Sequence, residues 1–163
     1  AAFGGKPFAI REEMYTFKAP WSRDKVRVLT SIDLGAIKID RGLNRPDDQD
    51  YAVSWIKRYG EGRVFYCSLG HGDTTYYQPA VMRHFLAGIQ FALGDLDADA
   101  TPSGPLSPAR LAENKRVGDA GFQRVGSHDA WYRTRLSRHF RACGGGVFLH
   151  KDAAPVLFTL ETV

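Results

Sequence analysis

Two runs of nearly continuous apolar residues stand out along the chain. The first covers residues 26–32 and is rich in β-branched side chains, and the second covers residues 64–69. Apolar runs of this length are typical of strands in a parallel sheet that helices cover on both faces. We therefore expect these two segments to be parallel strands, adjacent or nearly adjacent in one sheet.

Residues 51–59, which lie between the two runs, have apolar positions at a spacing that suits a helix. Asp50 can cap the first turn of such a helix. Gly60 can end it, because glycine accepts the left-handed conformation that terminates helices. The pattern predicts a helix here that bridges the two strands by a right-handed crossover.

Residues 79–93 carry the stronger helical pattern. Apolar side chains recur every four residues, and Pro79 suits the first position of a helix, which Gly94 would end. The order of strand, helix, strand and helix predicts an α/β layer structure. The face expected to pack against the sheet consists of Val81, Phe85, Leu86 and Ile89.

Composition changes after Asp95, which divides the chain into three predicted parts. Residues 1–95 hold the α/β pattern, and residues 96–122 are rich in Pro, Ser and Asp, as linkers are. Within this linker Ser107-Pro108 can cap a short helix over residues 109–117. Residues 123–163 form a basic tail to which the sequence assigns no fold.

Overall composition is that of a globular protein. Of the 163 residues 44% are hydrophobic and 25% charged, which argues against wholesale disorder. No apolar run is long enough to span a bilayer, so no membrane partner is expected. The first residues resemble neither an initiation site nor a signal peptide and read like the interior of a longer protein. The compartment therefore stays open among bacterial cytoplasm, periplasm and exterior.

The formal net charge of +4 divides equally between the parts before and after Asp95, and within the second part the arginines form a group. A nucleic-acid-binding arm is one interpretation of this group, but a solvated basic face explains it more simply. We therefore do not expect a nucleic-acid partner. The arginines are Arg124, Arg133, Arg135, Arg138 and Arg141.

The strongest local sign of chemistry is His71, which closely follows the second apolar run. In open α/β sheets the carboxyl ends of the strands are where ligands bind. An imidazole there can exchange protons near neutral pH, while Gly70 and Gly72 let the backbone approach a ligand closely. A turn histidine held for structural reasons is an equally good interpretation of the spacing alone.

A second candidate group lies near the start of the chain. Glu13 and Tyr15 share one face of an extended segment and can point together toward His71. In this arrangement Glu13 would orient His71 or act as a base, although a solvated acidic pair, Glu12-Glu13, is the simpler interpretation. The spacing does not choose between them.

Cysteine and metal chemistry find little support in the sequence. Cys67 lies inside the second strand rather than at a strand-to-helix turn, so we expect a small buried hydrophobe and not a nucleophile. The histidines show no zinc-ligand spacing, and no phosphate or dinucleotide motif is present. The sequence identifies no metal ligands, leaves a divalent metal unsupported and leaves any cofactor unknown.

Taken together, residues 3–95 resemble the C-terminal half of a ThuA-like (trehalose utilisation) domain. The match rests most on residues 59–66, running into residues 68–71, with the helix end at 88–94. Further landmarks are the segments Gly5-Lys6-Pro7-Phe8, Glu12-Glu13-Met14-Tyr15, Val26-Arg27-Val28-Leu29 and Asp50-Tyr51-Ala52-Val53-Ser54-Trp55.

This resemblance implies a flavodoxin-like fold similar to class I glutamine amidotransferases, with the N-terminal half missing from the sequence. It also implies a role in carbohydrate catabolism, with His71 and Glu13 as the acid–base residues and Tyr15 binding the sugar. Members of the family lack the amidotransferase cysteine, so amidotransfer is not implied. The expected partner is a small-molecule sugar, with an oligomer or the missing half of the protein as further partners.

A non-catalytic carbohydrate-binding or interaction module is the alternative function. It shares the fold with a sugar-processing enzyme. The two differ in whether His71 and a carboxylate come within hydrogen-bond reach, and in whether substitution there removes turnover or only binding.

Overall fold

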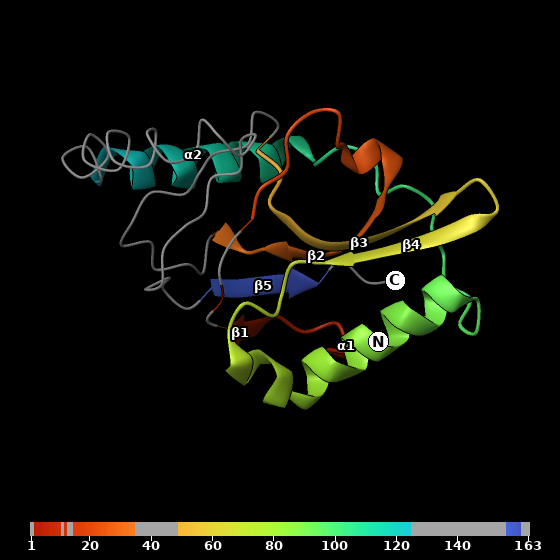
Figure 1. The fold of residues 1–163 in the computed structure, drawn as a ribbon. Helices are drawn as coiled ribbons and strands as arrows, with labels where there is room; N and C mark the ends of the chain where they lie inside the picture. The colour runs from red at the N-terminus through yellow and green to blue at the C-terminus, as the bar shows by residue number, and fades with distance from the viewer. Residues whose placement is uncertain (1, 11, 13–14, 35–48, 125–155, 161–163) are drawn as a thin grey trace, which may run out of the picture.

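The computed structural model describes residues 2–10, 12, 15–34, 49–124 and 156–160. Five strands form one sheet in the order β1-β5-β2-β3-β4. In the view of Figure 1, helices α1 and α2 lie on opposite sides of the strands. The strands are β1 (Phe8–Ile10), β2 (Arg27–Ile32), β3 (Ala52–Tyr59), β4 (Gly62–Cys67) and β5 (Val156–Leu160), and the helices are η1 (Arg23–Lys25), η3 (Asp73–Tyr77), α1 (Pro79–Leu93) and α2 (Pro108–Arg124).

The helix predicted over residues 51–59 is wrong, because this segment is strand β3. It pairs antiparallel with β4 through a hairpin that joins Tyr59 to Gly62, and Gly60 in this turn has φ of 57°. Glycine with positive φ ends helices and also makes tight hairpins, so the same residue fits both structures. The first half of β3 is buried on both faces of the sheet, since the consecutive residues Ala52, Val53 and Ser54 are all buried, and its apolar residues then lose the alternation that distinguishes strands from helices.

Neighbouring strands of the sheet do not run parallel, contrary to what the sequence predicts. Each hydrogen-bonded pair of strands is antiparallel, and the sheet is therefore antiparallel within the described residues. The predicted strands at 26–32 and 64–69 correspond to β2 and β4, which run in the same direction with β3 between them. The coarse α/β prediction is confirmed, and the two runs are nearly adjacent strands of the same direction, but the sheet is antiparallel and the predicted bridging helix is a strand.

Helix α1 has the predicted bounds, but the predicted buried face is wrong in part. Leu86 and Ile89 are 56% and 52% exposed, and Phe85 is half-buried. The side of the helix that packs on the sheet carries Val81, His84, Gly88 and Phe91. Gly88 permits this orientation, since a Cβ atom there would lie 2.3 Å from the ring of Phe65 on β4.

Residues after α1 return along the sheet instead of leaving it. The Ser103 amide donates to the Val26 carbonyl, and the Val28 amide donates to Ser103 Oγ, both at 3.0 Å. Helix α2 begins as predicted at Pro108, with Ser107 Oγ accepting from the Arg110 amide, and it extends beyond the predicted end.

Strand β5 comes from the part of the chain to which the sequence assigned no fold. It lies between β1 and β2 and pairs with both. Without β5 the short strand β1 would have no neighbour among the described strands. The far end of the chain therefore connects the first strand to the rest of the sheet.

Candidate functional site

Three strands point their carboxyl ends to one edge of the sheet. Strands β1 and β2 are each antiparallel to β5, and β2 and β4 are each antiparallel to β3, so β1, β2 and β4 run in the same direction (Figure 1). The chain that follows β1 and the chain that follows β4 therefore leave the sheet at the same edge. We call residues 68–77, after β4, the His71 loop.

Glu12 joins these two segments. Its side chain is buried, with a residue exposure of 3%, and one carboxylate oxygen accepts from the Gly70 amide at 3.0 Å. The other oxygen accepts from the His71 amide at 3.2 Å, and the hydroxyl of Thr75 also donates to the carboxylate. A buried carboxylate is stable only when donors of this kind surround it. Glu12 thus fixes the path of the His71 loop.

The path of the His71 loop also requires a glycine at position 70. Its φ of 116° is a conformation that other residues rarely adopt. A Cβ atom there would lie 2.4 Å from the Tyr76 hydroxyl, which donates to the Gly70 carbonyl at 3.1 Å. The loop therefore turns back on itself at Gly70, directly before His71.

The structure places the predicted site residues as follows. His71 lies in the loop beyond β4 with its side chain exposed to solvent, while Glu12 holds its backbone. Tyr15 is half-buried, in the segment that follows Glu12. Glu13 lies outside the described residues.

The sequence predicts Glu13, of the pair Glu12-Glu13, as the carboxylate near His71. In the structure the carboxylate that contacts the His71 loop is that of Glu12. The alternation of the preceding strand was a usable signal, because residues two apart share a face and both Ile10 and Glu12 are 3% exposed. A carboxylate in phase with a core residue is buried, and it then needs donors.

A second polar group lies inside the protein between α1 and the sheet. His84 Nε2 is 2.9 Å from Ser54 Oγ, which in turn is 2.6 Å from Thr30 Oγ1. A serine within hydrogen-bond distance of a histidine is the geometry of an activated nucleophile. Here the serine has no exposed surface, so no substrate can reach it, and we interpret the group as a satisfied buried network.

The buried histidine gives a pH-dependent stability. Burial lowers the pKa of His84 from 6.5 to about 4, so the unfolded chain takes up this proton before the folded protein does. Stability from the neutral imidazole is thus fully present above pH 6.5 and is lost as the pH falls toward 4, by about 3 kcal/mol in total. Urea unfolding followed at several pH values measures this loss.

Two variants separate His84 from other titrating groups. His84→Gln should remove most of the loss between pH 6.5 and 4, because glutamine keeps a polar group near Ser54 without titrating. His71→Gln, at an exposed position, should leave the loss unchanged. An unaltered pH dependence in His84→Gln would show that another group is responsible.

Cys67 ends β4 close to the His71 loop. Burial raises the pKa of its thiol to about 11, and the charge of Glu12 also contributes to the increase. The thiolate is the nucleophilic form of cysteine, and little of it exists near neutral pH at such a pKa. The expectation of a small buried side chain rather than a nucleophile agrees with this environment.

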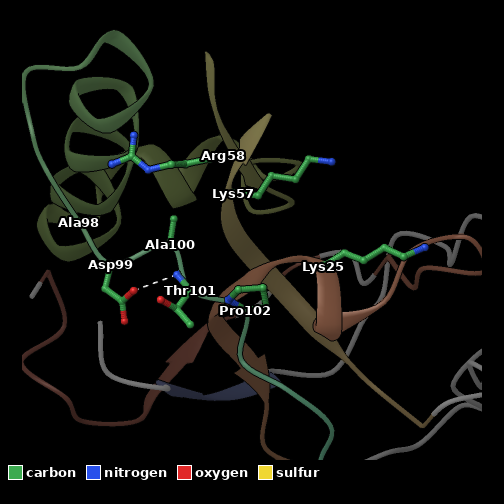
Figure 2. A pocket seen from close by; sticks show the side chains of 8 residues that line it. All are labelled: Lys25, Lys57, Arg58, Ala98, Asp99, Ala100, Thr101 and Pro102. Carbon is green, nitrogen blue, oxygen red and sulfur yellow. Dashed lines mark hydrogen bonds between the residues drawn. The ribbon is translucent and has the colours of Figure 1, made fainter. Parts of the chain in front are cut away.

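A cavity of about 490 Å³ lies at the opposite edge of the sheet, where β2 begins and β3 ends. Figure 2 shows that its basic residues do not converge, since Arg58 points away from Lys57 and Lys25. Each of the three has another partner: Lys25 donates to the Pro20 carbonyl, Lys57 lies over the Tyr59 ring and Arg58 contacts Asp97. This cavity is therefore not part of the His71 site.

Within the described residues, no group of three or more His, Cys, Asp or Glu side chains could hold a metal ion. No helix in the same part of the chain is long and apolar enough to cross a membrane.

Comparison with known proteins gives one match. The model of the family ThuA, described as trehalose utilisation, matches residues 2–92. This range includes Glu12, the His71 loop and almost all of α1. Searches of the curated proteins and of the solved structures each found no significant match.

Proposed function

Because the chain belongs to the ThuA (trehalose utilisation) family, we propose that it takes part in breaking down trehalose or a related glycoside or sugar derivative. The sugar would bind at the sheet edge where β1, β2 and β4 end. The contact of the buried Glu12 carboxylate with the His71 loop lies at this edge, which favours it as the binding site.

The observation that supports the proposal is the contact between Glu12 and the His71 loop. A buried carboxylate that accepts from two consecutive amides holds His71 in one place while leaving its side chain exposed. Catalytic and binding groups need such fixed positions, because small displacements reduce their effect strongly.

In the proposed mechanism His71 transfers a proton to or from the sugar oxygen that reacts. Glu13, which follows Glu12 directly, is the proposed second acid–base group, and Tyr15 the proposed hydrogen-bond donor to a sugar hydroxyl. Glu12 acts as a positioning residue, since its carboxylate is occupied by the amides of the loop. General acid–base catalysis of this kind contributes about 10²–10⁴ to a rate.

Glutamine amidotransfer is not proposed. That chemistry needs a cysteine thiolate, and the pKa of Cys67, near the same edge, is raised to about 11. Among the described residues Cys67 is the free cysteine, and its raised pKa keeps the thiol protonated near neutral pH.

Substitution of His71 tests the proposal. In the full chain His71→Ala should reduce the turnover of trehalose or a related glycoside by about 10²–10⁴ without changing the melting temperature, because the side chain is exposed. Tyr77→Ala is the matched control: this side chain is 80% exposed at the end of the same loop, and the variant should retain activity. Product release and calorimetric sugar binding are the measurements.

The outcomes distinguish the two functions. Loss of turnover with retained sugar binding supports proton transfer by His71. Loss of binding in a protein that never turns the sugar over indicates a carbohydrate-binding module. Unchanged turnover and binding in His71→Ala overturn the proposal for this site.

A further inference from the structure

The peptide bond directly before His71 is held by two side chains. Its polar groups are the carbonyl of Gly70 and the amide of His71, which point in opposite directions in a trans peptide. The Tyr76 hydroxyl donates to the carbonyl at 3.1 Å, and the amide donates to the Glu12 carboxylate at 3.2 Å. Tyr76 and Glu12 therefore hold this peptide unit from its two sides.

The local backbone does not fix the peptide unit without such partners. Gly70 has φ of 116°, and glycine moves between backbone conformations more freely than other residues. The orientation of the next residue, His71, then depends on contacts with other parts of the chain. Glu12 supplies one contact from the interior, and Tyr76 supplies the other from the exposed side of the loop.

The ring of Tyr76 is itself fixed by the body of the protein. It stacks on Phe85 of α1, with ring centroids 6.0 Å apart and an angle of 21° between the planes. Phe85 in turn meets Phe65 of β4 edge to face, with centroids 6.5 Å apart. Three aromatic rings thus connect the sheet, helix α1 and the His71 loop, and they determine where the Tyr76 hydroxyl lies.

The Tyr76 side chain also packs tightly against the backbone of Gly70. A Cβ atom at this glycine would lie 2.9 Å from the ring carbon that carries the hydroxyl, so only glycine leaves room for the ring. Because 48% of Tyr76 is exposed and one hydrogen bond adds only modestly to stability, we expect the contact to affect orientation more than folding.

On the basis of the proposed function, we propose that Tyr76 is a positioning residue for His71. Its hydroxyl keeps the peptide unit between Gly70 and His71 in the orientation that directs the imidazole toward the reacting sugar oxygen. Proton transfer needs heavy atoms within about 3 Å, and a displacement of about 1 Å can cost about 10²-fold in rate. Loss of the hydroxyl therefore slows proton transfer more than it weakens sugar binding.

Tyr76→Phe in the full chain tests this role, because it removes the hydroxyl and keeps the ring on Phe85. We expect kcat for the sugar to fall by about 10–100-fold with little change in KM, as for an interaction that acts in the transition state. Tyr77→Phe is the matched control, since it removes the same atom from the next residue, which is 80% exposed, and it should leave kcat and KM unchanged. Both variants should keep the melting temperature of the wild type.

A second measurement needs no sugar. Amide relaxation by NMR gives the order parameter of the His71 backbone, which we expect to be about 0.85, as in rigid backbone, in the wild type and in Tyr77→Phe. In Tyr76→Phe it should fall toward about 0.6, because the peptide unit is then held from one side only.

The two measurements separate this inference from the proposed function. If His71→Ala leaves turnover unchanged, the proposed function fails, and the order parameter still decides whether Tyr76 holds the loop. An unchanged order parameter in Tyr76→Phe overturns the inference whatever the activity. An unchanged kcat in Tyr76→Phe, when His71→Ala removes turnover, also overturns it, and a raised KM in that case would show that Tyr76 contacts the sugar instead.

Discussion

Replacing Arg23 with alanine is expected to lower the free energy of unfolding by about 3–5 kcal/mol. Its guanidinium Nε is 2.6 Å from a carboxylate oxygen of Asp50, and the two side chains are only 7% and 5% exposed. Removal of the arginine leaves the buried Asp50 charge without its closest cation. Urea unfolding followed by the fluorescence of the three tryptophans measures the change.

Two comparisons make this prediction specific. Arg58→Ala breaks an ion pair with Asp97 whose side chains are 54% and 81% exposed, and it should change stability by less than about 1 kcal/mol. The double variant Arg23→Met with Asp50→Leu should be more stable than Arg23→Ala, because it leaves no charge buried. Equal losses in Arg23→Ala and Arg58→Ala would contradict the importance of burial.

The position of the pair explains why a large effect is expected. Arg23 lies in η1, before β2, and Asp50 lies directly before β3. A second arginine nitrogen also lies 3.5 Å from Ser31 Oγ on β2. The ion pair therefore connects the segment before β2 to the segment before β3.

Phe91→Ala is expected to destabilise the protein by about 3–5 kcal/mol. The ring is 2% exposed and packs with Leu29 of β2 and Ile56 of β3, with the Arg63 guanidinium 5.5 Å from its centre. Its removal opens a cavity between α1 and the sheet, which the surrounding strands cannot fill. Chemical denaturation gives the change in free energy.

Tyr77→Ala is the control for Phe91→Ala, because it also replaces an aromatic residue with alanine. It removes an aromatic ring that is 80% exposed, and its effect should stay below about 0.5 kcal/mol. A small effect of Phe91→Ala, similar to that of Tyr77→Ala, would show that α1 is not held to the sheet by this face.

Some parts of the fold follow from short-range patterns. The bounds of α1 are predicted correctly, because Pro79 and Gly94 act locally on the backbone. The start of α2 depends in the same way on Ser107 and Pro108. The two apolar runs are strands, since the β-branched residues of the first and the aromatic residues of the second both favour extended structure.

Other parts could not be predicted from local patterns. Residues 52–59 satisfy a helical spacing and a buried strand equally well, and pairing with β2 and β4 decided between them. Helix α1 has apolar residues on two sides, so spacing alone did not reveal its sheet-facing side. The close approach of Gly88 to Phe65 and the bond from His84 to Ser54 belong to the side that packs on the sheet.

For the site, the sequence by itself determined where the His71 loop lies along the chain, because an apolar strand followed by glycines requires a turn at that point. It also determined the ThuA family, which the match over residues 2–92 shows. Only the tertiary structure decided that Glu12 contacts this loop, since the two segments are far apart in the chain and meet where β1 and β4 end. The physical reason is that caps and turns act between neighbouring residues, whereas the partner of a buried carboxylate depends on how distant strands are ordered in the sheet.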